Sequence, residues 1–545
     1  MPMISAEDLT KIVEGDVDMS DTTRDIYSRD ASIFEIKPEV VVRPKNANDL
    51  SKLIQYVKAH AGVSLTARSA GTDMGGGPLS ESIVLDFTKY FNNIHEIKDG
   101  HAVVEPGVYY RDFDKATIEQ VGQIMPSYPA SRELCTVGGI VSNNSGGEKT
   151  LTYGKTNRYV KRLKVVLQDG NEVEFRPLNV AELEEKKKLS TFEGELYRKM
   201  HDLIIGNKNI IANAKPKVSK NSCGYYLWDI QKEDGIFDLT QLIVGSQGTL
   251  GLVTEIEFAL VKPKPHSRML VIFLKDLNML GEIANHVLKF KPESFESYDD
   301  HTFKVAMKFL PTLMKQMGSN IISLGISFIP EMFAVLRGGV PKMVLMAEFT
   351  ADTEIEAADA ARRARESLEE FHIETELTKT EEDAKKYWTI RRESFNMLRK
   401  HVKNVRTAPF IDDFVVLPEK LPEFLPKLYS VLDEYKHLTY TIAGHVGDGN
   451  FHIIPLMDLK EESAHKTIEG LSVRVYKLVL EYGGSITGEH NDGIIRTPFV
   501  KMQFGDDMYR LFEETKKIWD PQNIFNPGKK VGGSLEYAFR HVIKH

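Results

Sequence analysis

Two histidines and a glutamate–histidine pair in the last quarter of the chain are the residues best suited to do chemistry. His445 and His452 bracket a glycine-rich segment that follows an apolar run and precedes Ile453-Ile454. The glycines within it permit a tight reversal, which would place the two imidazoles across from each other with Cβ atoms about 5 Å apart. Two histidines at that separation can share a metal ion; the alternative is a pair of hydrogen-bonded loop histidines.

A second glycine-rich segment, residues 483–490, ends in Glu489-His490. Two histidines and one carboxylate suit Zn²⁺ or another divalent transition metal with open coordination positions. The predicted metal ligands are His445, His452 and Glu489. Asp448 is a lesser candidate, because three donors already suffice. His490 is then free to act as a base, since an imidazole titrates near neutral pH.

A glycine-rich stretch near the start of the chain, Arg68–Gly77, could bind phosphate. Four of its ten residues are glycine, and glycines let successive backbone N–H groups point into one concavity. Arg68 could add a bidentate charge. The apolar segments at 63–67 and 82–86 are predicted strands, so the stretch joins strand to strand. This setting argues against a dinucleotide or P-loop site, where phosphate lies at a helix N-terminus. The alternative is a mobile surface turn.

Two further segments are rich in glycine, amide and hydroxyl residues. Residues 126–158 show no clear helix or strand pattern, and a loop of that length is usually functional or disordered. Its apolar residues argue against disorder. Residues 245–251 lie between segments at 242–244 and 253–260 that are predicted to be strands. Both segments are therefore candidates for ligand contacts.

The chain is predicted to form two domains with a lead-in and a tail. Residues 1–33 are a polar lead-in, and 34–264 alternate short strands and helices. A proline-containing linker at 263–265 precedes an α+β domain on an antiparallel sheet, at 265–497. Residues 498–545 form a helical tail.

The composition predicts a soluble protein without an iron–sulfur cluster of its own. The 545 residues are 42% hydrophobic and 27% charged, with a net charge of −8, which implies no general attraction to nucleic acid. Cys135 and Cys223 are too few for a cluster, which needs about four cysteines, and fit a reducing compartment. The acidic N-terminus is not expected to be a signal peptide. We expect a cytoplasmic location, with contact at the inner face of the membrane as an option.

Four motifs in this order resemble those of a known family. They are Arg68–Gly77, Pro129–Gly147, Gly245–Glu255, and the His445/His452 pair with Glu489-His490. The set resembles the FAD-linked oxidases of the vanillyl-alcohol-oxidase/PCMH superfamily. Within that superfamily it is similar to the group of D-lactate dehydrogenase, glycolate oxidase and D-2-hydroxyglutarate dehydrogenase. The resemblance covers about residues 34–530. It implies a two-subdomain PCMH-type FAD-binding domain, an α+β cap domain and a C-terminal segment that returns to the FAD domain.

The resemblance implies that the glycine-rich segments hold FAD. Members with covalent FAD often carry a histidine in the first loop, where this chain has Thr72-Asp73, so noncovalent FAD is expected. The implied cofactor-binding residues are Arg68, Ser69, Ala70, Gly71, Thr72, Asp73, Met74, Gly75, Pro129, Ser131, Thr136, Gly138, Gly139, Asn143, Ser145, Gly146, Tyr153, Gly248, Thr249, Gly251, Val253 and Asn526.

The resemblance also implies roles in the active site. Metal-dependent members use two histidines and a glutamate as ligands and the adjoining histidine as base, which matches the residues above. The segment Trp388–Arg391 resembles the one whose arginine binds the substrate carboxylate, so Arg391 is expected to take that role. The alternatives are the neighbouring Arg392 in the same role and a solvated helical arginine. Asp412-Asp413 and Arg496 look like a subgroup pattern. Asn491 stands where the family usually has glycine, and no match is found for an additional lysine that some members use.

The implied activity is oxidation of a D-2-hydroxy acid to the 2-oxo acid. His490 removes the hydroxyl proton, a zinc, manganese or iron ion assists, and a hydride passes to flavin N5. Electrons then leave to an external acceptor: a quinone, a cytochrome or an electron-transfer flavoprotein. Two other classes remain open, a metal-dependent hydrolase without flavin and a non-catalytic nucleotide-binding module. The apolar segment 303–340 could face a membrane or partner, or could be cap-domain core or a homodimer interface.

Overall fold

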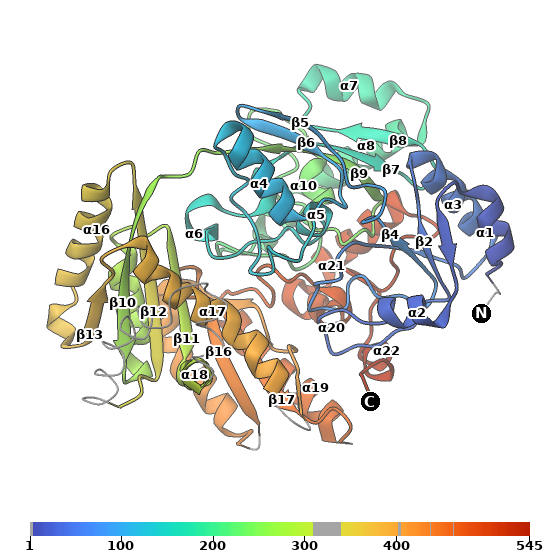
Figure 1. Ribbon diagram of the computed structural model, residues 1–545. Coiled ribbons are helices and arrows are strands. Elements are labelled where there is room, and N and C mark those ends of the chain that lie inside the picture. The colour runs from blue at the N-terminus through green and yellow to red at the C-terminus, as the bar shows by residue number, and fades with distance from the viewer. Residues whose placement is uncertain (1–3, 309–338, 402–404, 437, 462, 545) are drawn as a thin grey trace.

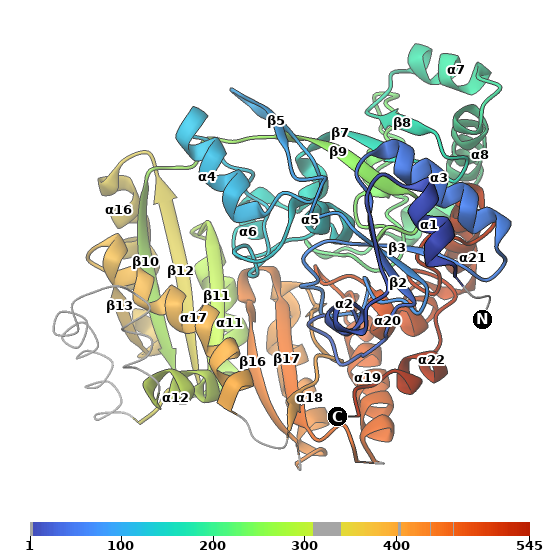
Figure 2. The same cartoon turned by 45° about the vertical axis from the view of Figure 1, so that its right-hand side comes forward.

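The computed structural model describes residues 4–308, 339–401, 405–436, 438–461 and 463–544. It has two lobes, which lie side by side (Figures 1 and 2). The N-terminal lobe carries a four-stranded and a five-stranded sheet, and the second lobe carries one eight-stranded sheet.

The four-stranded sheet of the N-terminal lobe has the order β1-β2-β4-β3. Its strands are β1 (Asp16–Asp18), β2 (Val40–Arg43), β3 (Leu65–Arg68) and β4 (Ile83–Asp86). The last three are parallel. Helix α3 (Ala47–Ala59) joins β2 to β3, and its N-cap is Asn46, whose side chain accepts a hydrogen bond from the Asp49 amide. The lead-in forms α1 (Ala6–Ile12), β1 and α2 (Asp21–Tyr27), and β1 pairs with β2. The lead-in is thus part of this lobe.

The five-stranded sheet has the order β5-β6-β9-β7-β8 and is antiparallel. Its strands are β5 (Ile94–Lys98), β6 (His101–Val104), β7 (Val160–Val166), β8 (Glu172–Phe175) and β9 (Leu252–Ala259). The helices around it are α4 (Tyr110–Val121), α5 (Val137–Asn143), α6 (Thr150–Tyr153), α7 (Val180–Lys188), α8 (Phe192–Gly206), α9 (Lys208–Ala214) and α10 (Thr240–Ile243).

Two expectations for this lobe change. The strand predicted at 242–244 was wrong: these residues belong to α10 and the turn after it, because a short buried apolar run fits a helix and a strand equally well. The stretch 126–158 is less irregular than expected, since it contains α5, α6 and a turn of 3₁₀ helix at Thr156–Arg158.

The sheet of the second lobe is antiparallel, as predicted, with the order β13-β10-β12-β11-β16-β17-β14 and β15 against β17. Its strands are β10 (His266–Leu274), β11 (Ser294–Asp299), β12 (Met343–Ala351), β13 (Glu374–Leu377), β14 (Arg406–Thr407), β15 (Phe414–Val415), β16 (Thr439–His445) and β17 (Asn450–Met457). The helices are α11 (Leu280–Leu288), α12 (Asp300–Lys308), α16 (Glu354–Glu366), α17 (Glu381–His401), α18 (Leu421–Asp433) and α19 (Ser463–Glu481).

Side chains of β10 alternate between the two faces of this sheet. Met269, Val271 and Phe273 share a buried cluster with Tyr387 and Trp388 of α17. The intervening residues of β10 join the larger core with α11 and α16. Period-two alternation with helices on both faces explains why the strand reads as continuously apolar. The result fixes α17 against one face of the sheet.

The tail returns to the N-terminal lobe, as expected. It forms α21 (Val500–Trp519) and α22 (Leu535–Arg540), which follow the short helix α20 (Gly493–Arg496), and Figures 1 and 2 show α21 and α22 beside the N-terminal lobe. The Asn526 amide donates to the Leu65 carbonyl, and the Leu65 amide donates to Ile524. These bonds attach the tail to the edge strand β3.

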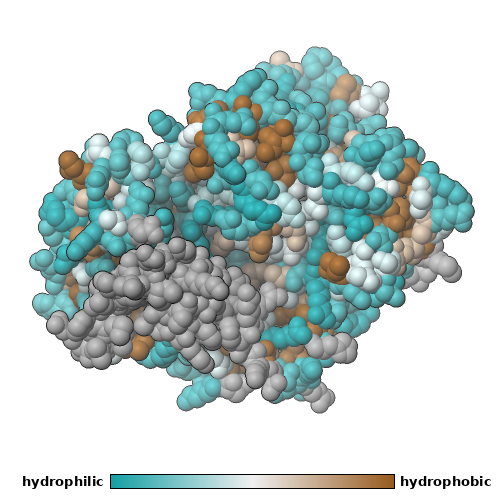
Figure 3. Space-filling view, viewed as in Figure 1, coloured by the Kyte–Doolittle hydropathy of each residue, from teal (hydrophilic) through white to brown (hydrophobic). Residues whose placement is uncertain are grey.

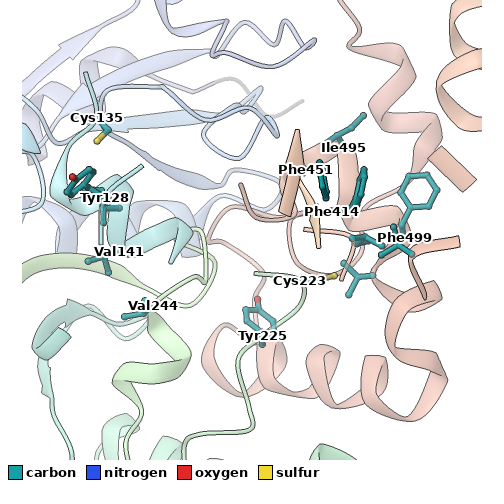
Figure 4. Close-up of a cluster of buried hydrophobic side chains, with 14 of the residues drawn as sticks. Tyr128, Cys135, Val141, Cys223, Tyr225, Val244, Phe414, Phe451, Ile495 and Phe499 are labelled. Carbon is teal, nitrogen blue, oxygen red and sulfur yellow. The ribbon is translucent and has the colours of Figure 1, made fainter. Parts of the chain in front are cut away.

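One hydrophobic core runs through both lobes and the tail. Figure 4 shows Tyr128 and Val244 of the N-terminal lobe, Phe414 of the second lobe and Phe499 of the tail as members of it. The face seen in Figure 3 is mainly hydrophilic, with apolar residues in small groups. No helix among the described residues is long and apolar enough to cross a membrane. Most of the apolar segment 303–340 lies outside the described residues.

Candidate active site between the lobes

A cavity of about 1060 Å³ lies between the lobes and is lined by both. This volume is at the upper end of ligand pockets, which span roughly 300–1,000 Å³. The N-terminal lobe contributes the Arg68–Gly77 loop and the segments at 129–146 and 246–253. The second lobe contributes α17, β16 and β17, together with Glu489 and His490. The glycine-rich segments and the histidines therefore share one cavity.

Most of the predicted cofactor residues line this cavity. Those that do are Arg68, Ser69, Gly71, Thr72, Asp73, Met74, Pro129, Ser131, Gly138, Gly139, Asn143, Ser145, Gly146, Gly248, Gly251 and Val253. Those outside the lining are Ala70, Gly75, Thr136, Tyr153, Thr249 and Asn526.

Several residues outside the lining hold the segments that form it. The Thr136 side chain caps α5 by accepting from the Gly139 amide. The Asn526 side chain donates to the carbonyls of Gly77 and Gln247, at 3.0 and 2.8 Å. Asn526 thereby joins the end of the Arg68–Gly77 loop to the 245–251 segment.

The Arg68–Gly77 loop makes internal bonds that the sequence does not reveal. Asp73 Oδ2 accepts from the amides of Gly75 and Gly77, at 2.9 and 2.7 Å, and its Oδ1 accepts from the Asn143 side chain at 2.9 Å. These two amides are therefore occupied, and a phosphate would have to use the other donors of the loop.

Arg68 anchors the lead-in and does not present a free guanidinium. Its Nη1 donates to the Tyr27 carbonyl and its Nη2 to the Arg29 carbonyl, at 3.0 and 2.7 Å. Burial lowers the pKa of this guanidinium. The expectation of a bidentate charge toward phosphate is not met in this conformation, although Arg68 lies at the cavity wall.

The predicted histidine pair lies on one face of a hairpin, but diagonally. His445 is paired with Asn450, and His452 with Ala443. Cross-strand diagonal neighbours lie on the same face of a sheet, and the ring centroids of the two histidines are 5.3 Å apart. The prediction that they face each other directly was wrong in register, although the rings are near enough to share a ligand.

Three imidazoles surround one oxygen of Glu489. Its Oε1 lies 3.1 Å from Nε2 of His445, 3.6 Å from Nε2 of His452 and 3.8 Å from Nε2 of His490. All three Nδ1 atoms bond to carboxylates, His445 to Glu296 at 2.5 Å and the other two to Asp412, at 2.8 and 2.7 Å. A carboxylate can only accept, so each Nδ1 carries the proton. The Nε2 atoms are thereby turned toward Glu489 and the cavity.

The electrostatics of this cluster follow from its carboxylates. Burial disfavours the protonated form of His490, but Asp412 and Asp413 outweigh it and raise the pKa to about 9. Burial likewise opposes protonation of His445, and Glu296 raises its pKa to about 9. Burial dominates at His452 and lowers its pKa. The surroundings of the cluster thus favour positive charge.

Asp413 is near enough to act as a ligand, but its oxygens are already engaged. Ligand atoms of Asp413, His452, Glu489 and His490 lie within 4.8 Å of one another. Asp413 accepts from the amides of Glu489 and His490, at 2.9 and 2.7 Å through Oδ2. Its Oδ1 accepts from Asn450 at 3.1 Å. Asp413 therefore orients the Glu489-His490 turn.

Asn491 holds the same turn against the N-terminal lobe. Its φ is 65°, in the left-handed region that explains the family's usual glycine. The Asn491 side chain donates to the carbonyls of Asn143 and Gly245, at 3.2 and 2.8 Å, and accepts from Lys530 at 2.7 Å. Asparagine thus keeps the conformation and adds three bonds to the neighbouring segments.

Lys220, Lys155 and Glu296 were not identified from the sequence. Lys220 Nζ lies 3.1 Å from Glu489 Oε2 and 3.4 Å from Asp448 Oδ2, and its side chain is fully buried. Lys155 Nζ donates to the Gly488 carbonyl at 2.6 Å. Each is far along the chain from Glu489, and no spacing pattern links them. Because Lys220 engages Asp448, that residue is not a free ligand.

The two arginines of α17 differ in their partners. Arg391 lines the cavity, its Nε lies 3.4 Å from Glu296 Oε2, and this buried nitrogen has no hydrogen-bond partner among the described residues. Arg392 donates from Nε and Nη2 to Glu148, at 3.2 and 2.5 Å. Arg391 is therefore the better candidate for a ligand carboxylate.

The residues present fit both groups that the resemblance implies. The imidazoles of His445 and His452 and the buried carboxylate of Glu489 are a donor set that would suit a divalent cation. Glu296 and Asp412 hold the imidazoles from the far side. The backbone of the glycine-rich segment closely approaches the cluster: a Cβ on Gly146 would lie 3.1 Å from Glu489 Oε2. The glycine segment and the histidine cluster therefore meet at this point.

Comparisons with known proteins agree with this arrangement. Residues 38–176 match the FAD binding domain, and residues 263–530 match the C-terminal domain of FAD linked oxidases.

Three curated relatives match nearly the whole chain. A D-2-hydroxyglutarate dehydrogenase of Pseudomonas putida is 28% identical over 94% of this chain, which spans about half of that relative's length (50%). The glycolate oxidase subunit GlcD of Bacillus subtilis is 27% identical over 94% of this chain and 93% of its own. A D-lactate dehydrogenase of Archaeoglobus fulgidus is 27% identical over 90% of this chain and 91% of its own.

Solved structures show the same fold. The 4-ethylphenol oxidase from Gulosibacter chungangensis superposes with a TM-score of 0.68 at 15% identity, covering 98% of this chain and 97% of its own. p-Cresol methylhydroxylase gives 0.67 at 15% identity, covering 97% and 96%. With two matched domains in the expected order and this shared architecture, the chain belongs to the FAD-linked oxidases with a PCMH-type FAD-binding fold.

Proposed function

We propose that this protein oxidises a D-2-hydroxy acid to the 2-oxo acid with noncovalently bound FAD. The observation that carries the proposal is the shared cavity, in which three imidazoles and Arg391 face the glycine-rich segments. The relatives named as D-2-hydroxyglutarate dehydrogenase, D-lactate dehydrogenase and glycolate oxidase support this reaction class. A hydrolase without flavin, or a simple nucleotide-binding module, would leave half of this cavity without a role.

The residues of the chain take separate parts in the reaction. Arg391 binds the substrate carboxylate and thereby fixes which face of the α-carbon is presented. His490 acts as the base through Nε2, because its Nδ1–H is donated to Asp412. With its pKa raised to about 9, it accepts the hydroxyl proton in the fraction of molecules in which Nε2 is unprotonated, and this fraction grows toward alkaline pH. Removal of this proton, and of the α-hydrogen with its electron pair, converts the alcohol carbon into a carbonyl.

Two bound groups complete the proposal. FAD, held by the glycine-rich segments, supplies a two-electron acceptor. A divalent metal ion such as zinc, held by His445, His452 and Glu489, supplies a Lewis acid that lowers the pKa of the substrate hydroxyl. The electrons leave the flavin to an acceptor outside these 545 residues, since Cys135 and Cys223 are too few to ligate an iron–sulfur cluster.

An anaerobic substrate panel tests the proposal. The purified protein should be yellow, and D-lactate, glycolate or D-2-hydroxyglutarate should bleach its flavin absorbance, whereas L-lactate and L-2-hydroxyglutarate should not. A chelator should slow bleaching, and added zinc or manganese should restore it. A flavin-free native protein, or flavin that none of these acids reduces, would refute the assignment; bleaching unaffected by chelation would refute the metal.

A further inference from the structure

Two arginines of α17 reach the cavity, and a dicarboxylic substrate could use both of them. Arg391 and Arg392 both line the cavity. A carboxylate binds best to two adjacent N–H groups of one guanidinium. The partners that these N–H groups of Arg391 and Arg392 already have therefore bear on whether the substrate carries one carboxylate or two.

The second arginine is already occupied by a carboxylate of the protein. Arg392 Nε and Nη2 donate to the two oxygens of Glu148, at 3.2 and 2.5 Å. The guanidinium carbon lies 4.9 Å from the ring centroid of Trp388, so stacking also holds it. Glu148 accepts a further bond from the Tyr128 hydroxyl at 3.2 Å.

Contacts from both lobes hold the Glu148 side chain against Arg392. The Glu148 side chain is 10% exposed, and it follows directly on the Gly146-Gly147 segment of the N-terminal lobe. It is anchored from the N-terminal lobe by Tyr128 and from the second lobe by Arg392. Arg391 differs, because its buried Nε has no hydrogen-bond partner among the described residues.

We propose that Glu148 is a specificity-determining residue, which occupies Arg392 and restricts the enzyme to 2-hydroxy acids with a single carboxylate. This inference rests on the proposed function. A second carboxylate on the substrate would have to displace Glu148 from a bidentate bond or lie beside its negative charge. Short monocarboxylic acids such as lactate or glycolate have no second carboxylate, so they neither displace Glu148 nor place a charge beside it.

Steady-state kinetics with D-lactate and D-2-hydroxyglutarate test this inference. The wild-type protein should favour D-lactate by tenfold or more in kcat/KM. Glu148→Gln removes the competing charge and should raise kcat/KM for D-2-hydroxyglutarate about tenfold, equivalent to about 1.4 kcal/mol. The kcat/KM for D-lactate should change less than about twofold, which corresponds to about 0.4 kcal/mol.

Matched variants separate this effect from a general change in charge. Glu133→Gln removes an acid at the same cavity that faces Arg132, and it should leave the substrate ratio unchanged. Adding Arg392→Met to Glu148→Gln should abolish the gain. Binding of pyruvate and 2-oxoglutarate, measured by perturbation of the oxidised flavin spectrum, gives the same comparison without turnover.

Each outcome is informative. A wild-type preference for the dicarboxylate, equal gains for both substrates, or a gain that survives the loss of Arg392 would overturn the role of Glu148. In all three cases the flavin is still reduced, so the proposed function stands. If no 2-hydroxy acid reduces the flavin, the proposed function fails first. Should Glu148→Gln fold poorly, Glu148→Asp, which shortens the reach toward Arg392, is expected to shift the ratio in the same direction.

Discussion

At the residue scale, the geometry of the site depends on carboxylates that bond to the Nδ1 atoms of the histidines, on the side of each ring that faces away from the cavity. Asp412 bonds to Nδ1 of both His452 and His490, so one side chain orients a proposed metal ligand and the proposed base. Such outer contacts fix the tautomer and the ring orientation of an imidazole. His452 and His490 also stack, with centroids 4.9 Å apart and planes 21° from parallel. Their geometry is therefore set jointly.

Asp412→Asn tests this joint orientation. An amide can donate as well as accept, so it no longer requires both Nδ1 atoms to carry protons. We expect the rate of anaerobic flavin reduction to fall about 100-fold, while the flavin content, measured by absorbance, stays at the wild-type level. A purely structural role would instead lower flavin content and rate together, and an unchanged rate would contradict the assignment.

At the element scale, the start of β11 is where the lobes are joined by buried polar groups. The Glu293 side chain accepts from the Tyr153 hydroxyl at 2.8 Å and lies 3.5 Å from Lys149. Glu348 of β12 is paired with Ser294, the residue after Glu293. Burial and the nearby Glu293 carboxylate raise the pKa of Glu348 to about 7. The pairing of β11 with β12 thus brings the two acids together.

Glu348→Gln should stabilise the protein above neutral pH. The folded pKa is about 7, against 4.5 for the ordinary group, so ionisation costs the folded state. The penalty is absent below pH 4.5, grows between pH 4.5 and 7, and is complete above it. We expect the variant to gain about 1–3 kcal/mol at pH 8 and nothing at pH 4.5. Urea unfolding at both values measures this, and an equal change at both would contradict the pKa as its cause.

At the scale of the whole molecule, the tail fastens the turn at residues 489–492 to the N-terminal lobe. Lys530 Nζ lies 2.8 Å from Asp492 Oδ2, donates to the Ser222 carbonyl at 2.9 Å and is fully buried. The Ile494 amide donates to the Gly75 carbonyl at 2.7 Å, which joins this turn to the first glycine-rich loop. The two lobes and the tail thus meet around one short segment.

Lys530→Met should destabilise the protein strongly. Removing one partner of a buried ion pair leaves an uncompensated charge and costs about 3–5 kcal/mol. The free energy of unfolding in urea should fall by that amount. Adding Asp492→Asn should recover part of the loss. Lys501→Met is the matched control, since this tail lysine is 59% exposed in its ion pair with Asp506 and should change stability by under about 0.5 kcal/mol.

Much of the site could be predicted from local patterns. Local structure can be predicted from glycine-rich loops, a His-x6-His hairpin and an adjacent Glu-His pair, because turn geometry and strand alternation act over a few residues. These patterns located the histidine cluster, the cavity wall and the antiparallel second sheet. They misjudged α10 and the hairpin register, since short apolar runs and tight turns permit more than one local solution.

The partners of the site residues depend on contacts between residues that are far apart in the chain. Glu296, Lys220 and Glu148 reach His445, Glu489 and Arg392 across 149, 269 and 244 residues. No local spacing encodes such pairings, because they arise only when β11 lies beside β16 and when the two lobes share a core. The chemical groups could thus be recognised in the chain, but which oxygens face them, and which arginine remains available to a substrate, follow from long-range packing.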